Sequence, residues 1–145
     1  MKIYCDTSVL VAWFHPADVF ASQVTDWLRE KPADILWNVA LRAETRHSLR
    51  KLKTHYARTA WNALRAAEHS RRLVLGKSFS ETLLEDLDGL SAQFAASVDA
   101  GTWDFFHVAA AQRDDADWFA TCDAAQAELA KEVGLATRLF KTTSR

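Results

Sequence analysis

The opening stretch of the chain, residues 2–14, joins a short apolar strand to an apolar segment through one acid, Asp6. Residues 2–5 are rich in strand-forming side chains, and residues 9–14 are interpreted as the helix or turn that leaves the strand. We expect Thr7 or Ser8 to cap that segment. Because ligands gather at the carboxyl ends of strands in open parallel sheets, Asp6 is a candidate site residue.

Strand and helix patterns alternate along the rest of the chain. Further strands are predicted at residues 35–37, 72–75, 118–122 and 135–140, and helices at about 17–30, 39–52, 54–70, 78–94, 102–113 and 124–133. We expect Asn38 and Thr102 to cap their helices, and Ser78 with Glu81 to form a capping box. This alternation predicts an α/β fold, specifically a three-layer α/β/α domain with a central, mostly parallel sheet of four to five strands.

Length and composition limit the class of protein. A chain of 145 residues with 49% hydrophobic residues is predicted to form one domain, 1–145, with a sizeable core. No apolar run approaches the roughly 18 residues that span a membrane, and the amino end is a poor signal peptide. Two cysteines do not form a disulfide framework. We therefore expect a cytoplasmic protein without a membrane partner.

A basic segment is hidden within the net charge of −1. Residues 42–77 contain ten Lys and Arg residues opposed only by Glu44 and Glu68, which gives this segment a formal charge of +8 and the remainder −9. Such a segment in a near-neutral protein indicates an anionic partner, with nucleic acid the first candidate. A solvated helical face is the alternative interpretation.

Four acids far apart in the sequence are predicted to converge on one edge of the sheet. Asp6 and Asp123 follow strands, Glu44 lies about two turns into a helix, and Asp104 lies in the first turn of another. Singly, each acid could instead be a cap or a surface residue. Clustered carboxylates repel one another unless a cation lies among them, and all-oxygen ligation favours Mg²⁺ or Mn²⁺.

Four segments carry a resemblance that covers nearly the whole chain. They read D-T-S-V-L at residues 6–10, A-E-T-R-H-S-L-R at 43–50, D-F-F-H-V-A-A-A at 104–111 and F-A-T-C-D at 119–123. Together they resemble the motifs of the PIN-domain ribonucleases, and within these the VapC-type toxins of toxin–antitoxin pairs. The pair Phe105-Phe106 departs from the small or aliphatic residues usual there. Gln126 stands where some relatives place a further acid.

The resemblance implies a metal-dependent endoribonuclease that leaves a 5′-phosphate and a 3′-hydroxyl. It implies that Asp6, Glu44, Asp104 and Asp123 are the catalytic, metal-binding acids, and that hydroxyls near the metal or phosphate come from Thr7, Ser8 and Thr121. The sequence does not decide whether the bound ion is Mg²⁺ or Mn²⁺, or whether one ion binds or two. We expect Arg46 and Arg50, one turn apart on the Glu44 helix, to bind RNA.

Two other classes of function stay open on the sequence. One is a non-catalytic PIN-like module that binds nucleic acid or protein, and the other is an α/β domain that uses an acidic pocket with one Mg²⁺ on phosphate or a small molecule. The resemblance further implies a cognate antitoxin protein and a homodimer. His107, one turn after Asp104, is interpreted as a structural residue. The RNA and its cleavage sequence are not encoded in any recognisable pattern.

Overall fold

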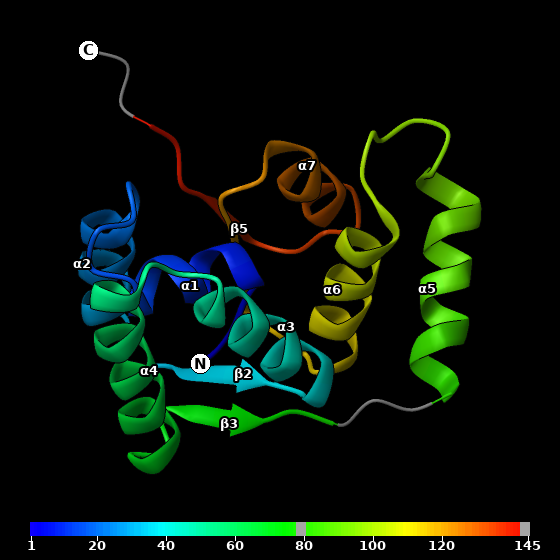
Figure 1. Ribbon diagram of the computed structural model, residues 1–145. Helices are drawn as coiled ribbons and strands as arrows, with labels where there is room; N and C mark the ends of the chain where they lie inside the picture. Colours follow the sequence, from blue (N-terminus) through cyan, green and yellow to red (C-terminus); the bar gives the residue numbers. More distant parts are fainter. Residues whose placement is uncertain (78–80, 143–145) are drawn as a thin grey trace.

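A five-stranded parallel sheet forms the centre of the protein, as a computed structural model shows for residues 1–77 and 81–142 (Figure 1). The strand order is β3-β2-β1-β4-β5, and every neighbouring pair is parallel. The strands are β1 (Lys2–Cys5), β2 (Asp34–Trp37), β3 (Leu73–Leu75), β4 (Trp118–Thr121) and β5 (Thr137–Leu139). The predicted parallel sheet is confirmed, with five strands.

The helices form two packed groups around this sheet. α1 contacts α2, α3 and α4, whereas α6 contacts α5 and α7, and Figure 1 shows α2 and α4 far from α5. Right-handed crossovers put helices that precede β3 and those that follow it on opposite faces of the sheet. The three-layer α/β/α fold is thus confirmed. The helices are α1 (Thr7–Phe14), α2 (Ala21–Glu30), α3 (Val39–Arg50), α4 (Thr54–His69), α5 (Glu81–Phe94), α6 (Thr102–Arg113) and α7 (Ala124–Glu132).

The core follows from this two-sided covering. The central strands β1 and β4 read as nearly continuous apolar runs because both of their faces are buried. Ile3, Tyr4, Cys5 and Phe119 are wholly inaccessible to solvent, and the Tyr4 and Phe119 rings stack at 5.7 Å between centroids. The two strands that carry the site are therefore rigidly held.

The residues that cap the helices were predicted less well than the strands. Asp6, not Thr7 or Ser8, caps α1, since its carboxylate accepts a hydrogen bond from the Val9 amide. Asn38 caps α3 as predicted. The helix α6 begins at Thr102 as predicted, but Thr102 is not its cap: the N-cap is Gly101, whose amide donates a hydrogen bond to the Asp104 carboxylate. The Ser78 capping box lies outside the described residues.

Two element boundaries also differ from the prediction. α2 begins at Ala21 rather than near residue 17, because the Asp18 side chain accepts a hydrogen bond from the Phe20 amide and holds a turn there. β5 is shorter than predicted, at Thr137–Leu139. Among the described residues, no helix is both long enough and apolar enough to cross a bilayer.

Candidate functional site

The site lies where the strand order reverses. The chain moves from β1 outward to β2 and β3, then returns to the other side of β1 to add β4 and β5. The carboxyl ends of β1 and β4 flank this switch point, the place where open α/β sheets bind ligands. Cys5 is in register with Ala120, so Asp6 and Thr121 are neighbours at this edge.

Asp6 is a buried carboxylate that is held by hydroxyl groups. Only 5% of the residue is exposed. Its Oδ1 accepts a hydrogen bond from Ser8 Oγ at 2.6 Å, and its Oδ2 accepts one from Thr121 Oγ1 at 2.7 Å. Burial raises the pKa of Asp6, and the bonds from Ser8, Thr121 and the Val9 amide oppose that rise. Asp6 is fixed in one orientation without any basic partner among the described residues.

Thr121 and Gln126 connect Asp6 to two other acids. Thr121 Oγ1, which donates to Asp6, also accepts a hydrogen bond from the Asp123 amide at 2.9 Å. Asp123 caps α7 through the Gln126 amide, and Gln126 Nε2 donates to Asp104 Oδ1 at 3.1 Å. Asp6, Asp123 and Asp104 thus belong to one continuous hydrogen-bonded network.

Glu44 joins the site through Thr7 and His107. The Thr7 hydroxyl donates a hydrogen bond to Glu44 Oε1, and His107 Nε2 lies 3.3 Å from the same oxygen. The hydrogen bond from His107 lowers the pKa of Glu44, with Thr7 adding to it and partial burial opposing it. Glu44 is therefore an ionised carboxylate whose side chain is one-third exposed.

A buried polar chain behind Glu44 sets the orientation of His107. Asn38 Nδ2 donates to the Tyr4 hydroxyl at 3.2 Å, and the hydroxyl lies 2.9 Å from His107 Nδ1. Burial raises the pKa of Tyr4 far above its ordinary value, so the phenol keeps its proton. The pattern is satisfied when the Tyr4 hydroxyl donates to Nδ1 of His107 and the Nε2–H of His107 donates to Glu44. His107 has the structural role predicted for it, and it also positions an acid of the site.

The donor set suits a hard divalent cation. Carboxylates and hydroxyls converge here, and among the described residues Asp6, Asp104 and Asp123 form no ion pair with Lys, Arg or His. Gln126 is 1% exposed, and its Oε1 is buried without a hydrogen-bond partner beside Asp104. Of these three acids only Asp6 is buried, whereas Asp104 is half-buried and Asp123 is exposed. A buried carboxylate without a cationic partner and an unsatisfied buried oxygen are both costly.

The acids are not arranged as a closed cage. Within residues 1–77 and 81–142, no three His, Cys, Asp or Glu side chains are placed to enclose a metal ion. The carboxylates are instead bound to hydroxyl and amide groups of the network, so cation binding would require them to exchange some of these partners. Metal ligation by Asp6, Glu44, Asp104 and Asp123 accordingly stays a prediction.

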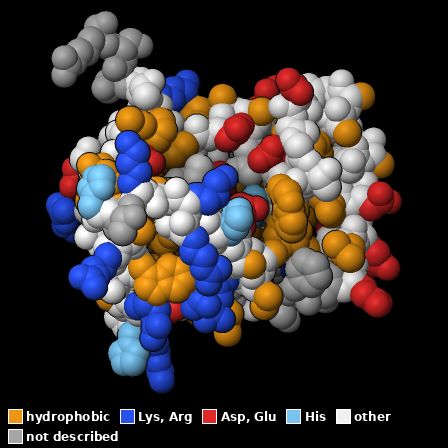
Figure 2. All heavy atoms as spheres, viewed as in Figure 1, with side chains coloured by type: hydrophobic (Ala, Val, Ile, Leu, Met, Phe, Trp, Pro, Cys, Tyr) orange, Lys and Arg blue, Asp and Glu red, His pale blue; other side chains and the backbone are white. Residues whose placement is uncertain are grey.

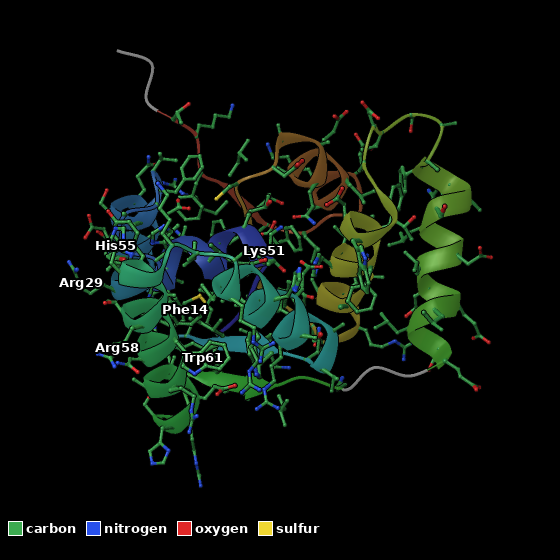
Figure 3. All side chains as sticks on the ribbon, viewed as in Figure 1. Phe14, Arg29, Lys51, His55, Arg58 and Trp61 are labelled. Carbon is green, nitrogen blue, oxygen red and sulfur yellow. The ribbon has the colours of Figure 1, made fainter. Side chains whose placement is uncertain are left out.

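The two arginines predicted to bind RNA face α4. Arg46 pairs with Glu68 at 3.1 Å, and the guanidinium groups of Arg46 and Arg50 lie 5.7 and 5.1 Å from the Trp61 ring centroid. Figure 3 shows Trp61 over α4. On an ideal helix both residues point well away from the face of Glu44. They contribute to a basic surface beside the acids rather than to the acidic cluster itself.

The wider charge distribution agrees with this placement. Lys and Arg side chains gather over α3 and α4, whereas Asp and Glu side chains gather over α5, α6 and α7 (Figure 2). Lys51, seven residues after Glu44, is exposed on the Glu44 side of the helix and lies beside α1 and α3 in Figure 3. It was not singled out from the sequence, although this helical spacing could have indicated it.

The family of the chain is shown by its sequence. A family profile described as the PIN domain matches residues 3–132, so the chain belongs to the PIN domain family. Among curated proteins, no sequence matches it significantly.

Solved structures share the fold at low sequence identity. VapC20 of Mycobacterium tuberculosis, described as a sarcin–ricin loop cleaving toxin, superposes with a TM-score of 0.70 at 16% identity over 92% of this chain and 96% of that one. VapBC2 of Rickettsia felis, bound to a DNA fragment from its promoter, superposes with a TM-score of 0.68 at 15% sequence identity, over 97% of this chain and 100% of that one. FitAcB of Neisseria gonorrhoeae superposes with a TM-score of 0.66 at 18% sequence identity, over 93% of this chain and 95% of that one.

The polar chain behind Glu44 yields a stability prediction. Tyr4→Phe removes the hydroxyl that Asn38 and His107 share and leaves two buried polar groups unpaired. We expect the free energy of unfolding to fall by about 1–3 kcal/mol, measured by urea denaturation. Tyr56→Phe is the matched control, because the half-buried Tyr56 hydroxyl makes no hydrogen bond within the described structure. Equal stability of the two variants would contradict the proposed chain of bonds.

Proposed function

We propose that the protein is a divalent-cation-dependent endoribonuclease and the toxin component of a type II toxin–antitoxin pair. The observation that carries the proposal is the linked set of acids at the β1/β4 switch point, with Asp6 buried among hydroxyls and without a basic partner in the described structure. Membership of the PIN domain family and the fold shared with VapC20 support the proposal.

Asp6, Asp104, Asp123 and Glu44 would hold the cation, with Mg²⁺ or Mn²⁺ the preferred ions for an all-oxygen donor set. When bound, the cation supplies Lewis-acid stabilisation of the negative charge that develops on the scissile phosphate. Ser8 and Thr121 bind both oxygens of Asp6 and fix its orientation, and the carboxylate would exchange one of these hydrogen bonds for the cation.

Glu44 is the acid best placed to act on water. It is ionised and partly exposed, and Thr7 and His107 both engage one oxygen, Oε1. The second oxygen, Oε2, makes no hydrogen bond among the described residues, so it would be available to the cation or to the attacking water, which a carboxylate can orient by accepting its hydrogen. His107 acts through Glu44 as a positioning residue.

The basic surface over α3 and α4 would hold the RNA backbone. Arg50 is exposed and makes only a cation–π contact among the described residues, so its charge is available to phosphate. Arg46 is partly neutralised by Glu68, which also pairs with Arg42. The surface therefore presents fewer free charges than the sequence count indicates. Phosphate contacts of this kind favour RNA largely independently of its sequence.

The partners of the protein are proposed by analogy with its structural neighbours. The neighbours include VapBC2 and FitAcB, and we propose by analogy that a small cognate antitoxin covers the acidic site. We also propose that the chain forms a homodimer.

A non-catalytic PIN-like binding module is the second candidate function. It is favoured by the lack of a closed cage of acids among the described residues. Such a module would bind RNA or a protein through the basic surface and would leave RNA intact.

Cleavage of total RNA by purified, antitoxin-free protein separates these functions. We expect cuts that carry 5′-phosphates in Mg²⁺ or Mn²⁺ and none in EDTA. Asp6→Asn and Asp104→Asn should each lower the rate about 100-fold or more, as losses of preorganised electrostatic groups do. Asp26→Asn, which changes an exposed acid on α2, should cut normally. No cleavage by folded, metal-loaded wild-type protein would favour the binding module.

Charge reversal tests the basic surface. Arg46→Glu with Arg50→Glu should weaken RNA binding and lower the salt dependence, with the slope of log K against log salt reduced by up to about 1.4 for two lost single-strand contacts. Arg29→Glu, on α2, is the control. Circular dichroism would verify folding, because Arg46 also pairs with Glu68. Unchanged affinity and slope would refute the assignment of both arginines.

A further inference from the structure

Trp103 is an exposed aromatic residue directly beside the acidic site. It occupies the second position of α6, immediately before Asp104, and 57% of it is exposed to solvent. Burial of so large an apolar ring would contribute favourable hydrophobic free energy to folding, and its exposure forgoes this contribution. Its position therefore points to a ligand that covers it.

The Trp103 ring is held in place by its neighbours on α6. The edge of one ring meets the face of the other between Trp103 and Phe106, with centroids 5.0 Å apart and planes at 81°. Phe106 itself is 2% exposed and belongs to the core. The Trp103 ring also lies 6.4 Å from the His107 ring. An exposed ring supported by buried neighbours is a preorganised surface rather than a freely rotating side chain.

Through His107, the ring adjoins Glu44 as well as Asp104. His107 Nε2 contacts Glu44 Oε1, and on an ideal helix Trp103 and His107 share one face, one turn apart. A nucleotide whose phosphate lies at the acids would thus meet Trp103 on the α6 side of the site.

Charge provides no attraction for RNA on this side. The single Lys or Arg of α6 is Arg113, at the far end of the helix and paired with Asp86. Asp104 and Glu44 are themselves acidic. Apart from the proposed cation, contact with RNA on this side is therefore non-ionic, and a neutral aromatic ring provides such a contact because every base has an apolar face.

We infer that Trp103 is a stacking platform for an unpaired base next to the scissile phosphate. This inference rests on the proposed ribonuclease function. In a duplex, neighbouring bases already cover both faces of each base, so the ring has nothing to stack on. Loops and single strands offer such a face.

Binding of two RNAs to variants that do not cleave tests the inference. All proteins carry Asp6→Asn, and fluorescence anisotropy in Mg²⁺ gives their affinity for an unstructured labelled oligoribonucleotide and for a duplex of the same length. Trp103→Ala should weaken single-strand binding about tenfold and duplex binding less than twofold. Trp103→Phe should restore most of the loss because it keeps an aromatic face. Val19→Ala, at a 73% exposed apolar position in the connection before α2, should change neither affinity.

Each other outcome overturns the inference in a recognisable way. If the parent binds single strands but Trp103→Ala binds them equally well, stacking is wrong and the proposed function stands. A shift in oligomeric state on sedimentation, without a change in affinity, would assign Trp103 to a protein interface instead. If neither the parent nor the wild-type protein binds either RNA, both the inference and the proposed function are overturned.

Discussion

Parallel pairing of β1 with β4 is the constraint on which the site depends. The chain adds β2 on one side of β1 and later adds β4 on the other, so the carboxyl end of β1 lies at the switch point. The register of β1 with β4 places Asp6 beside Thr121. Backbone hydrogen bonding from the Asp6 amide to Ala120 continues the pairing into the site. A slip of one residue would turn Thr121 to the other face of the sheet and remove the hydroxyl from the carboxylate.

Two polar networks spread outward from this pair of strands and carry out different tasks. One network runs from Asp6 through Thr121 and Gln126 to Asp104, and it gathers carboxylates. The other runs from Asn38 through Tyr4 and His107 to Glu44, and it orients one carboxylate from behind. Fully paired buried polar groups specify one arrangement, whereas the unpaired Gln126 Oε1 lies where the first network meets Asp104. The site is therefore rigid on its inner side and adaptable where a cation would bind.

Sequence patterns predicted the strands well because apolar runs with flanking acids mark the ends of buried strands, as at Asp6. They could not predict the partners of these acids. Tyr4 reads as a core aromatic, and only the three-dimensional structure brings its hydroxyl to His107, 103 residues away. The N-cap of α6 was assigned to Thr102 rather than Gly101, because the capping side chain, Asp104, comes from the first turn inside the helix. The basic charge of residues 42–77 was evident, but its partial neutralisation by Glu68 required knowledge of how α3 packs on α4.

The central claim, that these carboxylates form a divalent-cation site, is tested most directly by Mn²⁺ binding followed by electron paramagnetic resonance. The account predicts saturable binding to the wild-type protein that Mg²⁺ competes away, and at least about tenfold weaker binding to Asp6→Asn, since even loss of an outer-shell partner costs 10–100-fold. Asp26→Asn should bind as the wild type does. Equal Mn²⁺ affinity in the wild-type and Asp6→Asn proteins, or no binding to either, would contradict the account.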